Sequence, residues 1–598
     1  MSPPLTLADW RAAYAAPGAS PRDLLAPLLA RRDADDPAWI LRCDDAFVDA
    51  QLARLEGVER SALPLYGVPF AVKDNIDVLG LATTAACPAF SHLPQRSATV
   101  VERLQAAGAV LVGKTNLDQF ATGLVGTRSP YGEVPNPFDP AYVCGGSSSG
   151  SASVVARGLV AFALGTDTAG SGRVPAGFNN LVGLKPSPGR TPMAGVLPAC
   201  RTVDVVSVFA LTVADAAQVM AVIEGAEGEP SFQAASPRRP WLEATGAALR
   251  VGVPDAPRCD AALGYDSAYG DALGQLGAWG LEPRPVDMRP LFEVARLLYD
   301  GPWVAERYAV VQPLIESQPE ALDATVRRVI EAARRHDAVS AFRARYVLEE
   351  LRLRIAPLWR DIDVLMVPTA PTCPTRAAVA AEPVARNSEL GHYTNFVNLL
   401  GLAALAVPSG FTPHGLPFGV TFIGPPGSDA ALAVLGARWQ AARALALGCR
   451  LRPLASSDLA LRALPAAAPT LQIAVVGAHL QGMALHGQLV ERGCRFVART
   501  RTAARYRLHA LPGTSPPKPG LVRVPDAEAG HAIEVEVYEM PMAEVGSFLA
   551  LVAPPLALGS LELAGGRWVH GFLCESAALA GAAEISEHGG WRSYLASR

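Results

Sequence analysis

The chain has 598 residues, of which 50% are hydrophobic and 18% are charged, and its formal net charge is −4. A chain of this length exceeds what one hydrophobic core usually supports, so at least two domains are expected. The negative balance argues against a nucleic acid or an anionic membrane as the main partner. Apolar runs such as residues 399–407 are too short to span a membrane.

Residues 1–64 are expected to form short helices that pack on the domain that follows. Asp9 and Ser20 are of the types found at helix starts, and Pro17 and Pro21 mark turns. The N-terminal residues lack the charged segment and apolar stretch of a secretory signal. The nine cysteines are scattered without a C-x-x-C pair. A cytoplasmic protein without a metal site is therefore expected.

Between residues 65 and 452, short apolar runs alternate with helical segments. Strands are predicted at residues 67–72, 109–112, 160–164, 205–211, 249–253, 364–367 and 418–423, and helices at 101–107, 341–359 and 430–444. This alternation predicts an α/β domain with a large, mostly internal sheet.

Residues 453–470 are rich in Ala, Pro and Ser without a regular period, which predicts a linker. Strand-like patterns return at residues 471–476 and 533–538, and the second of these alternates apolar with acidic residues. Residues 471–598 are therefore expected to form a second domain of ordinary size.

Two segments match nucleotide-binding sequence patterns but lack the features needed to bind a phosphate group. Residues 108–115, GAVLVGKT, fit the phosphate-loop pattern, but the intervening residues are themselves a strand and not a loop whose amides could hold phosphate. Residues 477–482, GAHLQG, imitate a dinucleotide fingerprint. His479 stands where the middle glycine should let a pyrophosphate approach. Nucleotide binding is not predicted, and no cofactor is expected.

Two segments rich in serine and glycine lie within the apolar part of the first domain. The first, residues 144–151, reads CGGSSSGS, and the second, residues 165–173, reads GTDTAGSGR. A flexible linker would explain the composition of the first segment. Because the segment lies among apolar residues, however, it is expected to be buried, and a buried polar segment must satisfy its hydrogen bonds. This favours a functional site. In the second segment, Gly170 and Gly172 flank Ser171 and let the backbone approach a substrate closely. Consecutive amides around Ser171 could bind an oxyanion.

Lys73 is the candidate base for a serine nucleophile. It ends the apolar run 67–72, and burial lowers the pKa of a lysine because the ammonium loses its hydration. A lysine whose pKa is near neutrality can act as a general base. A structural cation paired with Asp74 or Asp77 explains Lys73 equally well, and residue chemistry alone leaves both interpretations open.

Residues 67–74, GVPFAVKD, together with the two serine segments resemble the amidase signature family, over roughly residues 65–430. The resemblance implies a Ser–cis-Ser–Lys triad whose serines are 24 positions apart, which selects Ser147 because 171 − 147 = 24. Lys73 would take a proton from Ser147, which relays one from Ser171. Ser171 would then attack the carbonyl carbon of an amide.

The same resemblance implies two backbone features. The Gly146–Ser147 peptide would be cis, a bond that proteins keep only where geometry demands it. The oxyanion hole would be formed by the amides of Thr168, Ala169, Gly170 and Ser171.

Further segments resemble the allophanate hydrolase branch of this family. They are residues 83–88, 169–173, 179–186, 298–307 and 393–400. The resemblance implies that Tyr299 and Arg307 recognise the carboxylate of allophanate, a small ureido carboxylate, since a guanidinium offers a planar bidentate donor. Without the resemblance, Arg307 would be interpreted as a surface arginine on a helix.

Residues 471 to about 575 resemble the allophanate hydrolase C-terminal domain. This implies an α+β fold similar to γ-glutamyl cyclotransferases and a second step, the decarboxylation of the N-carboxycarbamate that amide hydrolysis leaves. Loss of CO₂ places charge on nitrogen, so a proton donor would help. His479, at a Gly-flanked strand end, is the candidate, and a structural, hydrogen-bonded histidine is the alternative.

The expected overall reaction converts allophanate to ammonia and carbon dioxide during the use of urea or s-triazine nitrogen. The sequence shows no biotin-carboxylase region, so a separate urea carboxylase, or a cyanuric acid and biuret pathway, would supply allophanate. A homodimer without metal, nucleic-acid or membrane partners is expected. Two alternatives stay open: an amidase for another small carboxylated amide with a C-terminal domain used only for assembly, and an A-type transamidase subunit.

Overall fold

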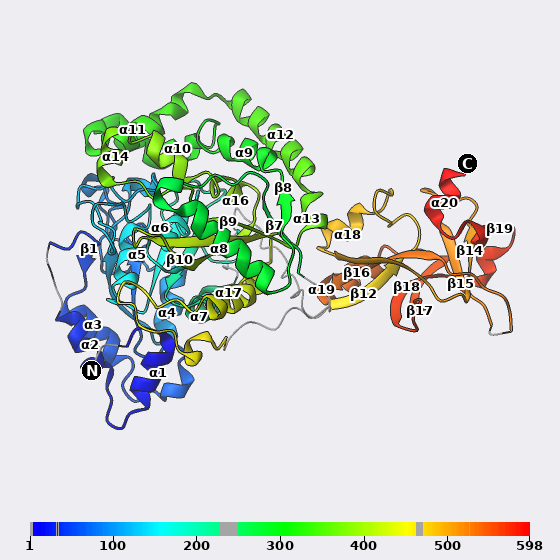
Figure 1. The fold of residues 1–598 in the computed structure, drawn as a ribbon, viewed down its shortest axis with the longest axis horizontal. Helices are drawn as coiled ribbons and strands as arrows, with labels where there is room; N and C mark the ends of the chain where they lie inside the picture. Colours follow the sequence, from blue (N-terminus) through cyan, green and yellow to red (C-terminus); the bar gives the residue numbers. More distant parts are fainter. Residues whose placement is uncertain are drawn as a thin grey trace. The chain divides into compact units, whose positions relative to one another are not determined.

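The computed structural model describes residues 4–30, 33, 35–225, 249–461, 470–525 and 527–597 (Figure 1). It divides into two compact units, Met1–Pro465 and Ala466–Arg598. Each unit has a hydrophobic core of its own. In the described ranges, none of the helices combines the length and the apolarity needed to cross a bilayer.

The first unit is built on an 11-stranded mixed sheet. From edge to edge its strands are β1 (Trp39–Arg42), β3 (Val110–Thr115), β2 (Pro69–Lys73), β4 (Phe162–Asp167), β6 (Val205–Ala210), β5 (Val182–Lys185), β10 (Ala403–Phe411), β11 (Pro417–Gly424), β9 (Val364–Pro368), β7 (Val251–Pro254) and β8 (Arg284–Val286). Strands β3, β2 and β4 run parallel, as do β9, β7 and β8. Because β2, β3 and β4 are buried throughout, their sequences are continuous apolar runs. The predicted α/β class is confirmed.

Helices surround this sheet (Figure 1). They are α1 (Leu7–Ala15), α2 (Pro21–Leu29), α3 (Asp45–Ala53), α4 (Thr99–Ala106), α5 (Ser149–Ala156), α6 (Val174–Phe178), α7 (Val213–Ile223), α8 (Tyr265–Ala278), α9 (Arg289–Leu297), α10 (Val304–Ser317), α11 (Ala324–Glu331), α12 (Ala338–Ile355), α13 (Leu358–Asp361), α14 (Arg376–Ala381), α15 (Ala385–Leu390), α16 (Asn395–Leu399) and α17 (Asp429–Arg443). Helices α7 and α17 pack near the middle of the sheet, and α9, α12 and α16 share a separate apolar cluster with β9.

The N-terminal segment contains one element that the sequence did not predict. Thr6 and Ser20 cap α1 and α2, as residues of their type should. Residues 39–42, however, form β1, an edge strand that pairs with β3. Only Trp39 is fully buried in this strand, so it lacks the alternation that would have identified it. Side chains of α1 and α2 belong to the same core cluster as the sheet.

The second unit contains two sheets. The five-stranded sheet has the order β13 (Arg495–Arg501), β16 (Glu534–Pro541), β12 (Thr470–Val475), β18 (Trp568–Cys574) and β17 (Leu556–Glu562). The three-stranded sheet has the order β15 (Pro519–Arg523), β14 (Tyr506–Ala510) and β19 (Ala583–Glu584). The helices of this unit are α18 (Gly487–Glu491), α19 (Met542–Leu549) and α20 (Trp591–Ala596). The two strands predicted from the sequence correspond to β12 and β16.

The segment predicted as a linker, residues 453–470, begins inside the first unit. It contains a short 3-10 helix, η8 (Ser456–Leu459). Buried Asp458 accepts a hydrogen bond from Thr6 Oγ1 at 2.9 Å and pairs with Arg452 at 2.8 Å. These contacts hold the chain on the N-terminal segment beyond the predicted start of the linker. Residues 462–469 of the predicted linker lie outside the described residues.

Candidate active site

Two buried lysines, Lys73 on β2 and Lys114 on β3, lie on neighbouring strands, and only Lys114 pairs with Asp74. Lys114, the lysine of the phosphate-loop-like segment, pairs with Asp74 Oδ1 at 2.9 Å and also donates to Thr83 Oγ1 at 2.6 Å. Asp77 accepts a hydrogen bond from Thr83 Oγ1 at 2.8 Å. Both carboxylates considered as partners of Lys73 thus have other partners, and Lys114 is a structural cation.

Lys73 is fully buried and donates to two hydroxyls, Ser147 Oγ at 2.7 Å and Thr166 Oγ1 at 2.9 Å. Within the described residues, no carboxylate lies at ion-pair distance from its Nζ. Burial lowers the pKa of Lys73 from 10.5 to about 7, and the carboxylates of Asp118 and Asp204 offset this shift only in part. The amine can therefore accept a proton at neutral pH. The structure brings the predicted base and the predicted relay serine together.

The Gly146–Ser147 peptide bond is cis, as the family resemblance implies. A side chain at Gly146 would place its Cβ 2.1 Å from Asp118 Oδ2, so only glycine fits. Asp118 donates its amide to the Ser147 carbonyl at 3.0 Å. Its carboxylate accepts from the amides of Gly126 and Arg128 at 3.0 and 3.1 Å. One aspartate thereby anchors Ser147 to a neighbouring loop.

A buried carboxylate also shapes the turn that carries Ser171. Asp167, the last residue of β4, accepts from the amides of Gly170 and Gly172 at 3.0 and 2.9 Å. The Arg173 guanidinium donates to both of its oxygens at 2.9 Å. Burial acts to raise the pKa of Asp167, but Arg173 outweighs burial and the pKa is lowered, so the carboxylate stays charged. Ser171, which is 2% exposed, lies between two anchored glycines.

The amides predicted for the oxyanion hole fall into two groups. Among the described residues, those of Thr168, Ala169 and Ser171 donate to no protein acceptor. The Gly170 amide donates to Asp167, which corrects the prediction for that residue because its N–H is used to shape the turn. Consecutive free amides at such a turn can stabilise a negative charge.

The end of β4 brings the two serine segments to one place. Thr166 Oγ1 accepts from Lys73, and the Thr166 carbonyl accepts from Ser148 Oγ at 3.3 Å. Asp167 follows directly and holds the Ser171 turn. Across the described ranges, no group of three or more His, Cys, Asp or Glu side chains is placed to hold a metal ion.

Arg307, on α10, is buried and not on the surface, with 2% of it exposed. Its Nη1 donates to Thr122 Oγ1 at 3.0 Å and to the Ala121 carbonyl at 3.2 Å, and its Nη2 donates to Tyr299 Oη at 3.2 Å. Its buried Nε has no hydrogen-bond partner within the described chain. The structure thus brings together the two residues expected to recognise a carboxylate.

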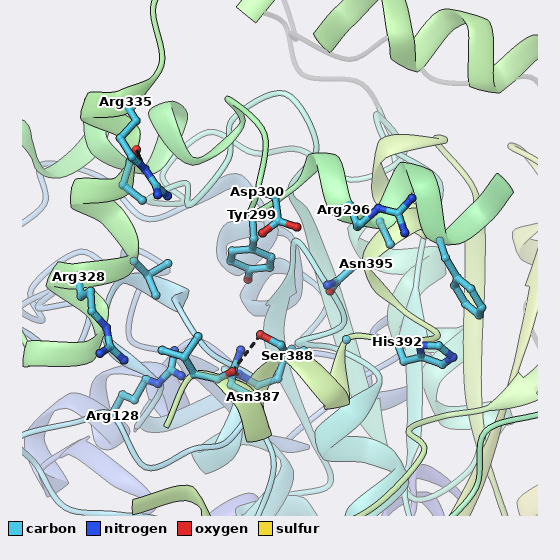
Figure 2. Close-up of a pocket in the computed structure, with 17 residues that line it drawn as sticks. Arg128, Arg296, Tyr299, Asp300, Arg328, Arg335, Asn387, Ser388, His392 and Asn395 are labelled. Carbon is cyan, nitrogen blue, oxygen red and sulfur yellow. Dashed lines mark hydrogen bonds between the residues drawn. The ribbon is translucent and has the colours of Figure 1, made fainter. Parts of the chain in front are cut away.

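A pocket of about 510 Å³ lies beside Tyr299 (Figure 2). Asn395 also lines it, and the preceding Thr394 donates to the Ala169 carbonyl at 2.6 Å. Tyr299 links the pocket to Arg307 by a hydrogen bond, and Asn395 is the sequence neighbour of the residue that contacts the Ser171 turn. Sequence reasoning missed its other polar residues, because arginines on separate elements form no motif.

In the second unit, His479 follows β12 and lines a pocket of about 30 Å³ together with Lys518. Its Nε2 lies 2.9 Å from Gln488 Oε1, and its ring stacks on Phe572 with centroids 5.0 Å apart. Burial lowers the pKa of His479, which favours the neutral imidazole. These contacts suit both a structural histidine and a functional one.

Comparison with known proteins supports a two-part chain. The amidase family matches residues 27–433, and the allophanate hydrolase C-terminal domain matches residues 471–596. A urea amidolyase of Lachancea kluyveri is 44% identical over 96% of this chain, which spans only 32% of that relative. The structure of Kluyveromyces lactis allophanate hydrolase is 42% identical, with a TM-score of 0.74 and coverage of 99% of both chains. The A-type subunit of a glutamyl-tRNA(Gln) amidotransferase from Synechococcus sp. is 34% identical over 70% of this chain and 92% of its own length.

The lowered pKa of Lys73 predicts how amide hydrolysis depends on pH. Because the deprotonated amine is the form that accepts a proton, kcat/KM should rise with pH through about 7 and level off above it. Lys73→Arg should reduce kcat by about 10²- to 10⁴-fold while the protein stays folded. NMR of ¹³Cε-labelled lysine, with the Lys73→Arg spectrum used for assignment, measures the same pKa directly. A rate that rises only near pH 10 would contradict this role.

Proposed function

The chain belongs to the amidase family and is an amidohydrolase, and we propose that its substrate is allophanate, which it converts to ammonia and N-carboxycarbamate. One observation carries this choice of amide. The likeness to Kluyveromyces lactis allophanate hydrolase extends over 99% of both chains, and so includes the C-terminal domain that a plain amidase does not need. Arg307 is buried, and no described carboxylate lies at ion-pair distance from it, although Asp204 and Glu306 act on its charge from further away. Such a cation suits an anionic substrate.

The proposed chemistry uses no histidine and no metal. Neutral Lys73 takes a proton from Ser147 Oγ, to which it is bonded at 2.7 Å, and Ser147 takes one from Ser171. Ser171 attacks the amide carbon, and the negative charge on the carbonyl oxygen is stabilised by the free amides of the turn, those of Thr168, Ala169 and Ser171. The protons return to the leaving nitrogen as ammonia departs. Water then releases the acyl group by the same route in reverse.

Arg307 and Tyr299 are proposed to bind the substrate carboxylate. A guanidinium can donate two parallel hydrogen bonds to one carboxylate, and the Arg307 Nε has no protein partner within the described chain. Tyr299 Oη accepts from Arg307 and keeps its own proton to donate, because burial raises the pKa of its phenol above the ordinary value of 10.0. The pair therefore selects amides that carry a carboxylate.

The C-terminal domain is proposed to promote the decarboxylation of N-carboxycarbamate. In that step the C–N bond to one carboxylate breaks, CO₂ leaves and the nitrogen gains a proton, giving carbamate, which decays to ammonia and CO₂. His479 is the candidate for delivering that proton. Its lowered pKa makes the imidazolium a stronger acid, so the protonated ring would give its proton to the nitrogen and regain one from solvent, with Lys518 in the same pocket facing the charge of the substrate.

Allophanate is proposed to come from a urea-carboxylating activity, in keeping with the urea amidolyases among the relatives. The chain spans about a third of the length of those relatives, so the rest of that activity is assigned to another polypeptide or segment. A homodimer and a cytoplasmic location belong to the same proposal. Light scattering and cell fractionation would test them.

The alternative of an A-type transamidase subunit has one observation in its favour, the 34% identity to a protein of that kind. That match covers only 70% of this chain and leaves the C-terminal domain without a role.

The central test counts the products from allophanate. The purified protein should release two ammonia molecules per allophanate without added nucleotide or metal. The Ser171→Ala variant, which lacks the proposed nucleophile, should release none. Absence of ammonia release by the wild-type protein would refute allophanate as the substrate.

Carboxylate recognition is tested with Arg307→Lys, which keeps the charge and loses the bidentate geometry. The value of kcat/KM for allophanate should fall about 10- to 100-fold relative to that for biuret, its neutral analogue, as expected for one or two charge-assisted hydrogen bonds. Parallel rate measurements on the two amides provide the ratio. Equal losses on both would mean that Arg307 has only a structural role.

The role of His479 is tested by following the two products separately in His479→Asn. The first ammonia should appear at the wild-type rate, while CO₂ and the second ammonia lag behind, at a rate limited by uncatalysed decay. Gln488→Ala, which removes only the partner of the imidazole, is the milder comparison. Simultaneous release of both ammonia molecules in His479→Asn would exclude the residue from this step.

A further inference from the structure

The pocket of about 510 Å³ is lined by four arginines and one aspartate, although the chain as a whole is acidic. Arg128 lies in the loop after β3, Arg296 on α9, Arg328 on α11, and Arg335 at the end of the 3-10 helix η7 (Ala332–Arg335). The aspartate is Asp300. Figure 2 shows Arg128, Arg328 and Arg335 along one side of the pocket and Arg296 on the other. We call this cavity the arginine pocket.

Arg128 is a buried cation that no carboxylate pairs with in the described part of the chain. It is 4% exposed, and its Nη1 and Nη2 donate to the carbonyls of Thr122 and Pro383 at 2.9 and 2.6 Å. Its Nε is buried without a partner. Carbonyl oxygens satisfy hydrogen bonds but leave the charge uncompensated, and an uncompensated buried charge is costly. An anion in the arginine pocket would reduce that cost.

Arg328 and Arg335 stand at the solvent side of the arginine pocket. Both are exposed, and neither forms an ion pair with any residue that the structure describes. Their charges therefore act on solutes that approach the pocket and not on a neighbouring carboxylate. Low-dielectric walls focus such a field into a cleft.

The arginine pocket leads toward the residues proposed to bind the substrate. Tyr299 lines it, and the Tyr299 hydroxyl is bonded to Arg307 at 3.2 Å. The charge of Arg128 is felt at Tyr299, since it opposes the burial that raises the pKa of that phenol. The buried Arg128, which lines the pocket with the exposed Arg328 and Arg335, and the buried Arg307 both donate to Thr122, Arg128 to its carbonyl at 2.9 Å and Arg307 to its hydroxyl at 3.0 Å.

We propose that the arginine pocket is the entry site through which the anionic substrate reaches Arg307. Arg328 and Arg335 attract the substrate from solution, and Arg128 binds it transiently inside the pocket. The inference rests on the proposed function for the identity of the substrate, a small amide that carries a carboxylate. Arg328 and Arg335 do not touch the reacting atoms. They raise the rate of productive encounter and leave the chemical step unchanged.

The test is the salt dependence of the double variant Arg328→Gln/Arg335→Gln. Electrostatic attraction between exposed charges weakens between about 20 and about 300 mM NaCl. At low salt, kcat/KM for allophanate should fall about three- to tenfold in the variant, its decline with salt should flatten, and kcat should not change. The matched control is Arg343→Gln/Arg345→Gln on α12, which removes two exposed arginines outside the pocket and should behave as the wild-type protein.

Two outcomes would overturn the proposal that the arginine pocket is the entry site of the substrate. The pocket variant could match the control in kcat/KM and salt slope, or it could lose kcat instead of kcat/KM. If the wild-type protein does not hydrolyse allophanate at all, the proposed function falls by itself. Calorimetry then tests the pocket separately, by measuring the binding of oxamate, a small amide carboxylate, and of neutral oxamide. Weaker binding of oxamate alone in the pocket variant would support the entry site. Equal binding of oxamate to the pocket variant and to the control variant would refute it.

Discussion

The proposed site depends on which of two buried lysines pairs with the carboxylate of Asp74. In the parallel register of β2 and β3, Lys114 lies opposite Val72, and its ammonium reaches Asp74 at 2.9 Å. Lys73 is left with the hydroxyl of Ser147 and a threonine. Burial lowers the pKa of both ammonium groups, but at Lys114 the adjacent carboxylate of Asp74 opposes that shift. Lys73 contacts only hydroxyls, and its pKa is lowered to about 7. The ion pair between Lys114 and Asp74 leaves Lys73, the proposed base, without a counter-ion.

The second requirement of the proposed chemistry is that Ser171 is held in a defined turn, and the end of β4 meets it. Asp167 binds the backbone on both sides of Ser171 and pairs with Arg173 in a site without solvent. Removing one partner of such a buried pair costs about 3–5 kcal/mol, so both are needed together. Asn398 on α16 accepts from Arg173 and donates to the Asp167 carbonyl at 2.8 Å. The same helix begins with Asn395, so the turn and the arginine pocket share one support.

The elements that the sequence predicted well are those whose burial is uniform. Strands β2, β3 and β4 are buried at every position, and a continuous apolar run marks them. Residues 39–42 escaped notice because an edge strand with one buried residue has no diagnostic pattern. The apolar run 399–407 is divided between the end of α16 and β10, a split that periodicity cannot detect in so short a segment. The linker predicted from residue 453 begins inside the first unit for another reason, because Asp458 accepts a hydrogen bond from Thr6, which lies far away in the sequence.

The sequence by itself selected the members of the proposed triad, Lys73, Ser147 and Ser171, through the resemblance of its three motifs to a family. Only the tertiary structure shows that Lys114, and not Lys73, reaches Asp74 across two strands, and this contact supports the proposal that Lys73 is the base. The structure also shows that the Gly170 amide donates to Asp167, and that Arg307, which the helix pattern alone would place on the surface, is buried. In each case the deciding quantity is a charge or a hydrogen bond between segments far apart in the chain. A linear pattern records residue types, but not which of them share a partner.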